Sequence, residues 1–413
     1  GLLKALDTKP KVEQKIDTTN TEAYEFYLKA KHKYEKRDNT NDTEIARGLL
    51  NKAIELDDNL ILAKLLLGTT YMQMGDYDEA MEIYTIALKQ SEELGDKRGM
   101  GMSLNNIGIV HKVKGDYDKA LDYYGRSIKI REEIDDKLGM GMSLNNIGIV
   151  HDNKGDYVKA LDYHKRSLAI REELGDKMGT GYSLLNIGVV HYNKGDYDKA
   201  LDYHKRSLAI REELGDKRGM GYSLLNIGAV HVNKGDYDKA LDYYARSLAI
   251  QEELGDKYAM GYSLNNIGGV HENKGDYYKA LDYLARSLAI QEELGDKHGM
   301  GYSLNNIGGM HYKTGNYDRA VEHLEKSLSI QKEIGLKEIE LKTTTYLYLS
   351  YKHLGKDYDI KQIHTLIKEN DNIDYDINYP LYQLLEDKSY LENAYKQVQE
   401  KASAMYDGAK FLS

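Results

Sequence analysis

The sequence predicts an all-α solenoid, in which pairs of helices stack one after another along the chain. The first observation is a segment of forty residues that recurs almost unchanged through the middle of the 413-residue chain. The second is that its apolar residues follow helical spacing, while recurrent glycines divide it into two halves. The third is that only Pro10 and Pro380 are prolines, so the repeats contain no residue that must break a helix.

The copies of the repeat define the expected organisation of the chain. Close copies begin at Gly99, Gly139, Gly179, Gly219, Ala259 and Gly299. A more diverged copy spans 61–100, and a shorter one of about 34 residues ends near Asn59. We therefore expect an array of about eight repeats over 21–340. An N-terminal linker or helix would occupy 1–20, and a diverged helical cap would occupy 341–413. In this cap we expect the last regular repeat to be covered by Leu347, Leu349, Leu354, Ile363 and Leu366.

The first half of each copy predicts a helix. In the copy that begins at Gly139, one face of this helix carries Leu144, Ile147, Gly148 and His151. Gly155 is expected to end the helix in a left-handed conformation, and Asp156 is expected to cap the next one.

The second half of the copy predicts a second helix that packs on the first. Its buried side is expected to carry Ala160, Leu161, His164, Ser167, Leu168 and Leu174. Gly175 would end it and Asp176 would begin the next pair, while Asp162 and Arg166 have the spacing of a solvent-exposed ion pair. Because Gly148 and Ala160 are small, we expect the two helices to approach closely there.

Composition restricts the possible functions. The chain has no cysteine, which excludes disulfides, thiol catalysis and cysteine-bound zinc. Its formal net charge is -10, which argues against nucleic acid or an anionic membrane as the partner. We find no apolar run long enough for a membrane span and no signal-peptide pattern, and we expect a cytoplasmic protein. Because the sequence begins with Gly1, we expect it to be part of a longer protein.

The repeats resemble the tetratricopeptide repeat. The residues that match its pattern in the first long copy are Leu67, Gly68, Tyr71, Ala80, Tyr84 and Ala87. The resemblance covers roughly 21–340, although the family's usual repeat is shorter, with about 34 residues. It implies a right-handed superhelix whose first helices line a concave groove that binds a protein or a peptide.

Helical geometry indicates which side chains would line that groove. We count positions so that Gly101 and its equivalent in each copy stand at position 1. Positions 2, 5, 6, 9, 12 and 13 are then expected to face away from the second helix. The candidate peptide-binding residues are Asn106, Asn146, Asn186, Asn226, Asn266 and Asn306 at position 6, Asn153, Asn193, Asn233 and Asn273 at position 13, and Tyr182, Tyr222, Tyr262 and Tyr302 at position 2.

The recurrent asparagines at position 6 allow two interpretations. An Asn amide offers donors and an acceptor that match a peptide unit, so a ladder of them could hold an extended backbone. Alternatively, these amides could bond to the neighbouring repeat and never meet a ligand. Positions 9 and 12 differ between copies, which indicates either ligand specificity or neutral drift at exposed sites.

Three patterns that resemble chemical sites are interpreted as structural. Histidine recurs at position 11, from His111 to His311, where the family packs an aromatic side chain. The string from Gly215 to Gly221 resembles a phosphate loop but lacks the preceding strand and the Gly-Lys-Ser/Thr ending. Acidic pairs such as Glu172 and Glu173 fall at helix ends. We therefore expect no catalytic residue, no metal and no cofactor.

Three functions remain open at the level of sequence. The leading one is a scaffold or sensor module that binds a peptide or a partner domain. A second follows from the two ends of the chain, since the segments 2–16, 21–36 and 389–402 resemble repeat regions of large bacterial signalling proteins. In such proteins a nucleotide cyclase domain or a TolB-like domain often precedes the repeats, so the array could regulate a cyclase upstream of Gly1. The third is self-association, with the groove of one array filled by another chain.

Overall fold

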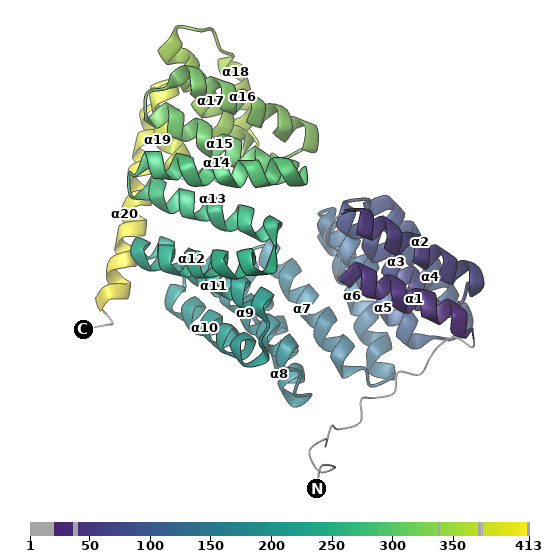
Figure 1. Cartoon of the computed structure of the whole chain (residues 1–413). Helices are drawn as coiled ribbons and strands as arrows, with labels where there is room; N and C mark the ends of the chain where they lie inside the picture. Colours follow the sequence, from purple (N-terminus) through teal and green to yellow (C-terminus); the bar gives the residue numbers. More distant parts are fainter. Residues whose placement is uncertain (1–19, 36–39, 338, 371–372, 374, 411–413) are drawn as a thin grey trace. The chain divides into compact units, whose positions relative to one another are not determined.

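The described part of the chain consists of α-helices joined by short turns (Figure 1). The computed structural model describes residues 20–35, 40–337, 339–370, 373 and 375–410. The helices are α1 (Thr21–Glu35), α2 (Thr40–Leu56), α3 (Ile61–Met74), α4 (Tyr77–Leu94), α5 (Lys97–Val113), α6 (Tyr117–Glu133), α7 (Lys137–Asn153), α8 (Tyr157–Glu173), α9 (Lys177–Asn193), α10 (Tyr197–Leu214), α11 (Lys217–Asn233), α12 (Tyr237–Leu254), α13 (Lys257–Asn273), α14 (Tyr277–Leu294), α15 (Lys297–Lys313), α16 (Tyr317–Ile334), α17 (Glu340–Leu354), α18 (Ile360–Lys368), α19 (Tyr375–Leu385) and α20 (Lys388–Lys410). The prediction of an all-α chain of paired helices is confirmed, whereas nearly all of the expected linker lies outside the described residues.

The chain divides into two compact units. Unit 1 is Gly1–Asn186 and unit 2 is Ile187–Ser413, so the division falls within α9. In the regular repeats, an odd-numbered helix packs on the even-numbered helix that follows, as α5 does on α6 and α11 on α12, and that helix packs on the next odd-numbered one, as α6 does on α7 and α12 on α13. Beyond them, α17 packs on both α18 and α19. We call the odd-numbered helices first helices and the even-numbered ones second helices.

The turns follow from glycine and aspartate at fixed positions. Gly155 has φ +73°, a left-handed conformation that ends α7 as expected. The Asp156 carboxylate then accepts a hydrogen bond from the Lys159 amide, which caps α8. Asp135 takes the same left-handed conformation with φ +53°, although most repeats place glycine there.

Close packing inside a pair depends on the small residues. A Cβ on Gly148 would lie 2.7 Å from the His164 ring, and Ala160 is completely buried. The expected close approach of the two helices is therefore confirmed. Leu174 was expected on the buried side but is 45% exposed, because it lies at the end of α8, beyond the contact with α7.

The apolar core lies between successive pairs as well as inside them. In unit 1, Tyr124 of α6 packs with Ile147 and Val150 of α7. In unit 2, Tyr244 of α12 packs in the same way with Val270 of α13. Each pair therefore needs the next pair to cover its apolar side.

The helices after the regular repeats continue the pairing with a shorter spacing. Lys342 and Lys352 of α17 form ion pairs with Asp376 and Glu386, each thirty-four residues further on. Tyr348 stands in α17 where the preceding repeat has the close-packed Gly308, and it donates a hydrogen bond to Gln362. A large side chain there leaves no room for the second helix to approach, and α18 is only nine residues long.

The apolar residues expected to cover the last regular repeat lie together. Ala320 and Leu324 of α16 belong to one buried cluster with residues of α17, α18 and α19. Of the five expected residues, Leu347, Leu349, Ile363 and Leu366 are buried in this cluster, and Leu354 packs against it.

Candidate functional site

The first helices present one face that the second helices do not cover. Positions 2, 6, 9, 12 and 13 of these helices are partly or fully exposed in all six regular copies, except for the buried Gly309. We call these five positions the first-helix face. Position 5 was expected to belong to it, but Asn105 and Asn305 are buried at this position because they take part in the contact between repeats.

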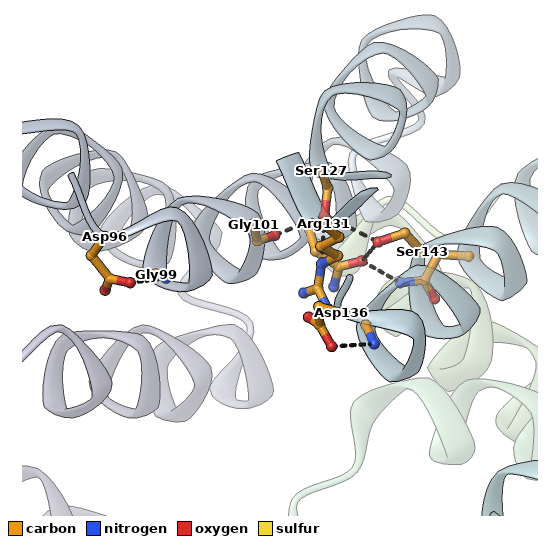
Figure 2. Close-up of polar contacts among 10 residues, drawn as sticks. Asp96, Gly99, Gly101, Ser127, Arg131, Asp136 and Ser143 are labelled. Atoms are coloured by element: carbon orange, nitrogen blue, oxygen red, sulfur yellow. Dashed lines mark hydrogen bonds and ion pairs between the residues drawn. The ribbon is translucent and has the colours of Figure 1, made fainter. Parts of the chain in front are cut away.

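A polar network joins successive repeats beneath this face (Figure 2). Ser127 Oγ of α6 donates to the carbonyl of Gly101 at 2.8 Å and lies 3.1 Å from Ser143 Oγ of α7. Ser143 Oγ donates to Asn105 Oδ1 at 3.1 Å. Asn105 Oδ1 also accepts a 3.1 Å hydrogen bond from Asn146 Nδ2. The network therefore leads from the buried junction to the first-helix face.

A buried arginine completes the junction (Figure 2). Arg131 is 4% exposed, and its Nε donates to Ser127 Oγ at 3.1 Å. Its Nη1 donates to Asp136 Oδ2 at 2.9 Å, while the other oxygen of Asp136 accepts from the Gly139 amide at 3.0 Å. A Cβ on Gly139 would lie 1.3 Å from the guanidinium, so only glycine leaves space for this arginine.

Three asparagines at position 6 bond to the preceding repeat. Asn146, Asn186 and Asn306 each donate from Nδ2 to the Oδ1 of an asparagine forty-one residues earlier. The distances are 2.9–3.1 Å, and the acceptors are Asn105, Asn145 and Asn265. For these three residues, the side chain takes part in the junction between repeats.

The other three asparagines at position 6 lack such a neighbour. The residues forty-one positions before Asn106, Asn226 and Asn266 are Leu65, Leu185 and Leu225, which have no amide. Asn226 instead donates to the carbonyl of Tyr222 in its own helix at 2.9 Å. Asn266 is exposed and has no hydrogen-bond partner among the described residues. The ladder therefore divides into a junction set and a set that does not bond to the preceding repeat.

The other candidate residues lie on the same face. At position 13, Asn153, Asn193 and Asn273 are exposed, whereas Asn233 is half-buried and donates to the Tyr192 hydroxyl at 2.6 Å. At position 2, Tyr182 is 49% and Tyr222 is 44% exposed, whereas Tyr262 and Tyr302 are half-buried. The face thus combines amides with aromatic rings.

The recurrent histidines have packing roles. In five copies the ring at position 11 stacks on a tyrosine of the second helix, with centroids 5.3–5.5 Å apart. His111 Nδ1 also lies 3.3 Å from Asp116 Oδ2. His164 and His204 are 1% exposed, and burial lowers the pKa of each to about 4. The part of the chain that the structure describes holds no group of three or more residues arranged to bind a metal.

The other two patterns also have structural explanations. Gly215 has φ +64° and ends α10, and Asp216 accepts from the Gly219 amide, so the glycine-rich string forms a turn between repeats. Glu173 forms a 2.7 Å ion pair with Lys137 of the same repeat. Such exposed pairs contribute little to stability.

Comparison with protein families agrees with this architecture. The tetratricopeptide-repeat family model matches residues 60–133, 99–173, 139–213, 179–253 and 259–333. These segments together cover more than half of the chain, which therefore belongs to the tetratricopeptide-repeat family. A search of curated protein sequences gives no match.

Solved structures share the fold at low sequence identity. A signal-transduction ATPase from Pyrococcus horikoshii with a tetratricopeptide-repeat sensor matches with TM-score 0.58 and 18% identity, over 85% of this chain and 52% of that one. A Rap protein complexed with competence and sporulation factor matches with TM-score 0.57 and 16% identity, over 84% of this chain and 98% of that one. The apo form of RapI matches with TM-score 0.52 and 16% identity, over 67% and 99%. This chain thus spans about half the length of the ATPase.

Within the described residues, no helix has the length and apolar character that crossing a membrane requires.

Proposed function

We propose that this repeat array binds an extended segment of another protein along the first-helix face of unit 2. Tetratricopeptide-repeat modules typically mediate protein–protein interaction, and the proposal gives the interaction a location. We also propose that this chain acts by binding, without catalysing a reaction. The observation that carries the proposal is the unpaired amide of Asn266, on a face where the amides of Asn146 and Asn306 bond between repeats.

The spacing of the first helices suits an extended chain. Neighbouring packed helices lie roughly 8–10 Å apart, which equals about three residues of an extended chain at ~3.3 Å each. Side chains at equal positions of successive first helices would therefore meet every third residue of the ligand. Amides at position 6 would bond to the ligand backbone, and tyrosines at position 2 would pack against its side chains.

Two structural relatives add support of a general kind. The Pyrococcus horikoshii ATPase carries its tetratricopeptide repeats as a sensor, and the Rap protein was crystallised with a bound factor. Both would be consistent with a ligand-binding role for the array described here.

The two sets of asparagines provide the test. Peptides are selected from a random library on the wild-type array, and their dissociation constants are measured by fluorescence anisotropy. The double variant Asn226→Ala and Asn266→Ala should bind about 5- to 150-fold more weakly, since two hydrogen bonds are each worth roughly 0.5–1.5 kcal/mol. Its melting temperature should stay close to that of the wild type.

The matched control changes the junction set. Asn146→Ala with Asn186→Ala should lower the melting temperature, because buried Asn105 and half-buried Asn145 each lose a hydrogen bond. N-methylation of single peptide amides should reduce affinity where the backbone is bonded. Unchanged binding by the Asn226 and Asn266 double variant, together with indifference to N-methylation, would refute backbone recognition.

Other occupants would use the same face. If the array regulates a nucleotide cyclase in the same polypeptide, the ligand would be a neighbouring domain, and the full-length gene would encode that domain. If the array self-associates, its molar mass in light scattering would rise with concentration. A constant monomer mass and a gene without a cyclase domain would leave a separate protein as the ligand.

A further inference from the structure

A pocket of about 430 Å³ opens among α15, α17 and α19 of unit 2. Tyr312 lines it from position 12 of α15. Leu349, Lys352 and His353 line it from α17, forty residues after positions 9, 12 and 13 of α15. The pocket therefore continues the first-helix face into the C-terminal helices.

Aromatic rings form much of the wall, and their neighbours hold them in place. The His353 ring stacks on Tyr317 with centroids 4.3 Å apart and an interplanar angle of 1°. The Tyr312 ring lies 5.8 Å from that of His353 and packs edge-on against buried Tyr346 at 5.4 Å. Tyr382 of α19 completes the aromatic wall. Rings that are already fixed lose little entropy when a ligand binds between them.

One ion pair also lines the pocket. Lys352 Nζ lies 3.0 Å from Glu386 Oε1 and donates to the carbonyl of Gln383 at 3.0 Å. The two charges compensate each other, so the pocket favours a neutral ligand group over a charged one. The ammonium has a third N–H, and the carboxylate has a second oxygen, which suits the two polar groups of a peptide unit.

Glu386 is held in an unusual backbone conformation. Its φ is +60°, in the left-handed region where glycine or asparagine is normally found at the end of a helix. Its amide donates to the carbonyl of Tyr382 at 2.8 Å, and its side chain is 81% exposed. An exposed glutamate in an unfavourable conformation indicates a use for the carboxylate beyond packing.

We propose that this pocket takes one neutral aromatic side chain of the protein segment bound along the first-helix face. Lys352 and Glu386 bond to the backbone of the segment beside that side chain. This inference rests on the proposed function and adds the chemistry of one ligand residue. Aromatic walls favour an aromatic guest through edge-to-face contacts, and a buried aromatic anchor in a pocket is the usual centre of a peptide interface.

The composition of the chain allows a direct test. Because the chain contains no tryptophan, the fluorescence of N-acetyltryptophanamide can be followed without background. Titration of the full chain should give a saturable blue shift. Tyr382→Ala should weaken this binding about tenfold or more, as expected for the loss of an aromatic wall. The control is Tyr395→Ala, which removes a 65% exposed tyrosine of α20 outside the pocket and should leave binding unchanged.

A second variant separates binding from folding. Glu386→Gly accepts the left-handed conformation, so the melting temperature should stay the same or rise. Loss of the carboxylate should still weaken binding of the probe by about three- to tenfold, because one hydrogen bond to its amide is lost.

Several results would overturn the inference. One is the absence of a saturable shift in the fluorescence of the probe, and another is equal binding of the probe by Tyr382→Ala and the wild type. A third is stronger competition with the probe by N-acetylargininamide or N-acetylglutamic acid amide than by N-acetyltyrosinamide. A library-selected peptide that binds Tyr382→Ala as tightly as the wild type would also overturn it. The proposed function would survive that last result if the Asn226 and Asn266 double variant still lost affinity for the same peptide.

Discussion

Arg131 illustrates how a charged residue is used inside the junction between repeats. Its guanidinium is 4% exposed, yet it reaches both Ser127 in its own helix and Asp136 at the start of the next pair. Arg171 occupies the same position and makes the same contacts one repeat later. Arg211 stands there in the next copy and also pairs with an aspartate, Asp216. The three copies after it place Gln251, Gln291 and Gln331 there instead. Gln251 bonds to Ser247 and accepts from Ser263 of the next repeat, so an amide can also bridge the junction.

This comparison predicts unequal effects of two substitutions at Arg131. Arg131→Ala should destabilise unit 1 by roughly 1–3 kcal/mol, because Asp136 and Ser127 lose their partner. Arg131→Gln should cost less than about 1 kcal/mol, because the chain already uses glutamine in the equivalent position. Urea denaturation followed by circular dichroism measures both. Equal losses for the two variants would contradict the role assigned to the bridging side chain.

The buried histidines predict a dependence of stability on pH. Burial lowers the pKa of His164 and His204 to about 4, from 6.5 for an unperturbed group. Between these values the unfolded chain binds more protons than the folded one, so the folded state loses stability as the pH falls from about 6.5 toward 4. The loss amounts to roughly 3 kcal/mol for each histidine. It should be absent above pH 6.5.

Replacement of both histidines by tyrosine tests this explanation. Tyr124 and Tyr244 occupy the equivalent buried position in other repeats, so the double variant should fold. Its melting temperature should change much less between pH 7 and pH 4.5 than that of the wild type. An identical acid dependence in the variant would exclude these two residues as its source.

At the scale of single residues, the sequence predicted which asparagines recur but could not decide their partners. Helical geometry places position 6 away from the second helix, and from there a side chain can reach either a peptide ligand or the neighbouring repeat. The residue forty-one positions earlier decides whether the amide has a partner in the preceding repeat. It is Asn105 for Asn146 and Leu225 for Asn266. That alternation is visible in the sequence. Its meaning depends on the distance between neighbouring first helices, which the sequence does not supply.

At the scale of one helix, α13 contains two adjacent glycines with different roles. A Cβ on Gly268 would lie 2.8 Å from Leu284 Cγ of the second helix, whereas a Cβ on Gly269 would meet no atom within 4 Å. Gly268 is therefore required by packing, and Gly269 is not.

The two glycines should respond to alanine with opposite signs. Gly268→Ala should destabilise unit 2 by roughly 1–3 kcal/mol through overpacking. Gly269→Ala should stabilise it by about 0.5–1 kcal/mol, because alanine favours the helix and nothing obstructs its methyl group. Gly125→Ala, in the equally open environment of α6, is a control for the second effect. Differential scanning calorimetry would contradict this explanation if both variants of α13 moved the melting temperature in the same direction.

Helix positions were predictable from the sequence where the repeat pattern is regular, and less so beyond it. The glycine and aspartate turns located α7 and α8 correctly, because these residues act through local geometry. The burial of Leu174 was predicted wrongly, because helical spacing does not reveal where the contact with the partner helix ends. The thirty-four-residue spacing of the C-terminal helices was missed, since Tyr348 replaces the small residue that marks the repeat.

At the scale of the whole molecule, stability is distributed over the contacts between neighbouring helix pairs. Each pair presents an apolar side that only the next pair covers, so a pair at an end of the array needs another cover. In unit 2, the cluster of α16 to α19 contains Ala320, Val321 and Leu324 of the last regular repeat. These side chains are at most 6% exposed.

Removal of the C-terminal helices should therefore affect the array more than removal of an internal repeat. A chain ending at residue 340 would expose the apolar side of α16 to water, so it should melt at a lower temperature and associate at micromolar concentration. Excision of residues 139–178 removes one complete repeat and places Gly179 where Gly139 now leaves space for Arg131, so that shorter chain should stay monomeric. Light scattering and thermal denaturation of both chains provide the comparison. If the truncated chain remained a monomer with the melting temperature of the wild type, residues 341–410 would not act as a cap.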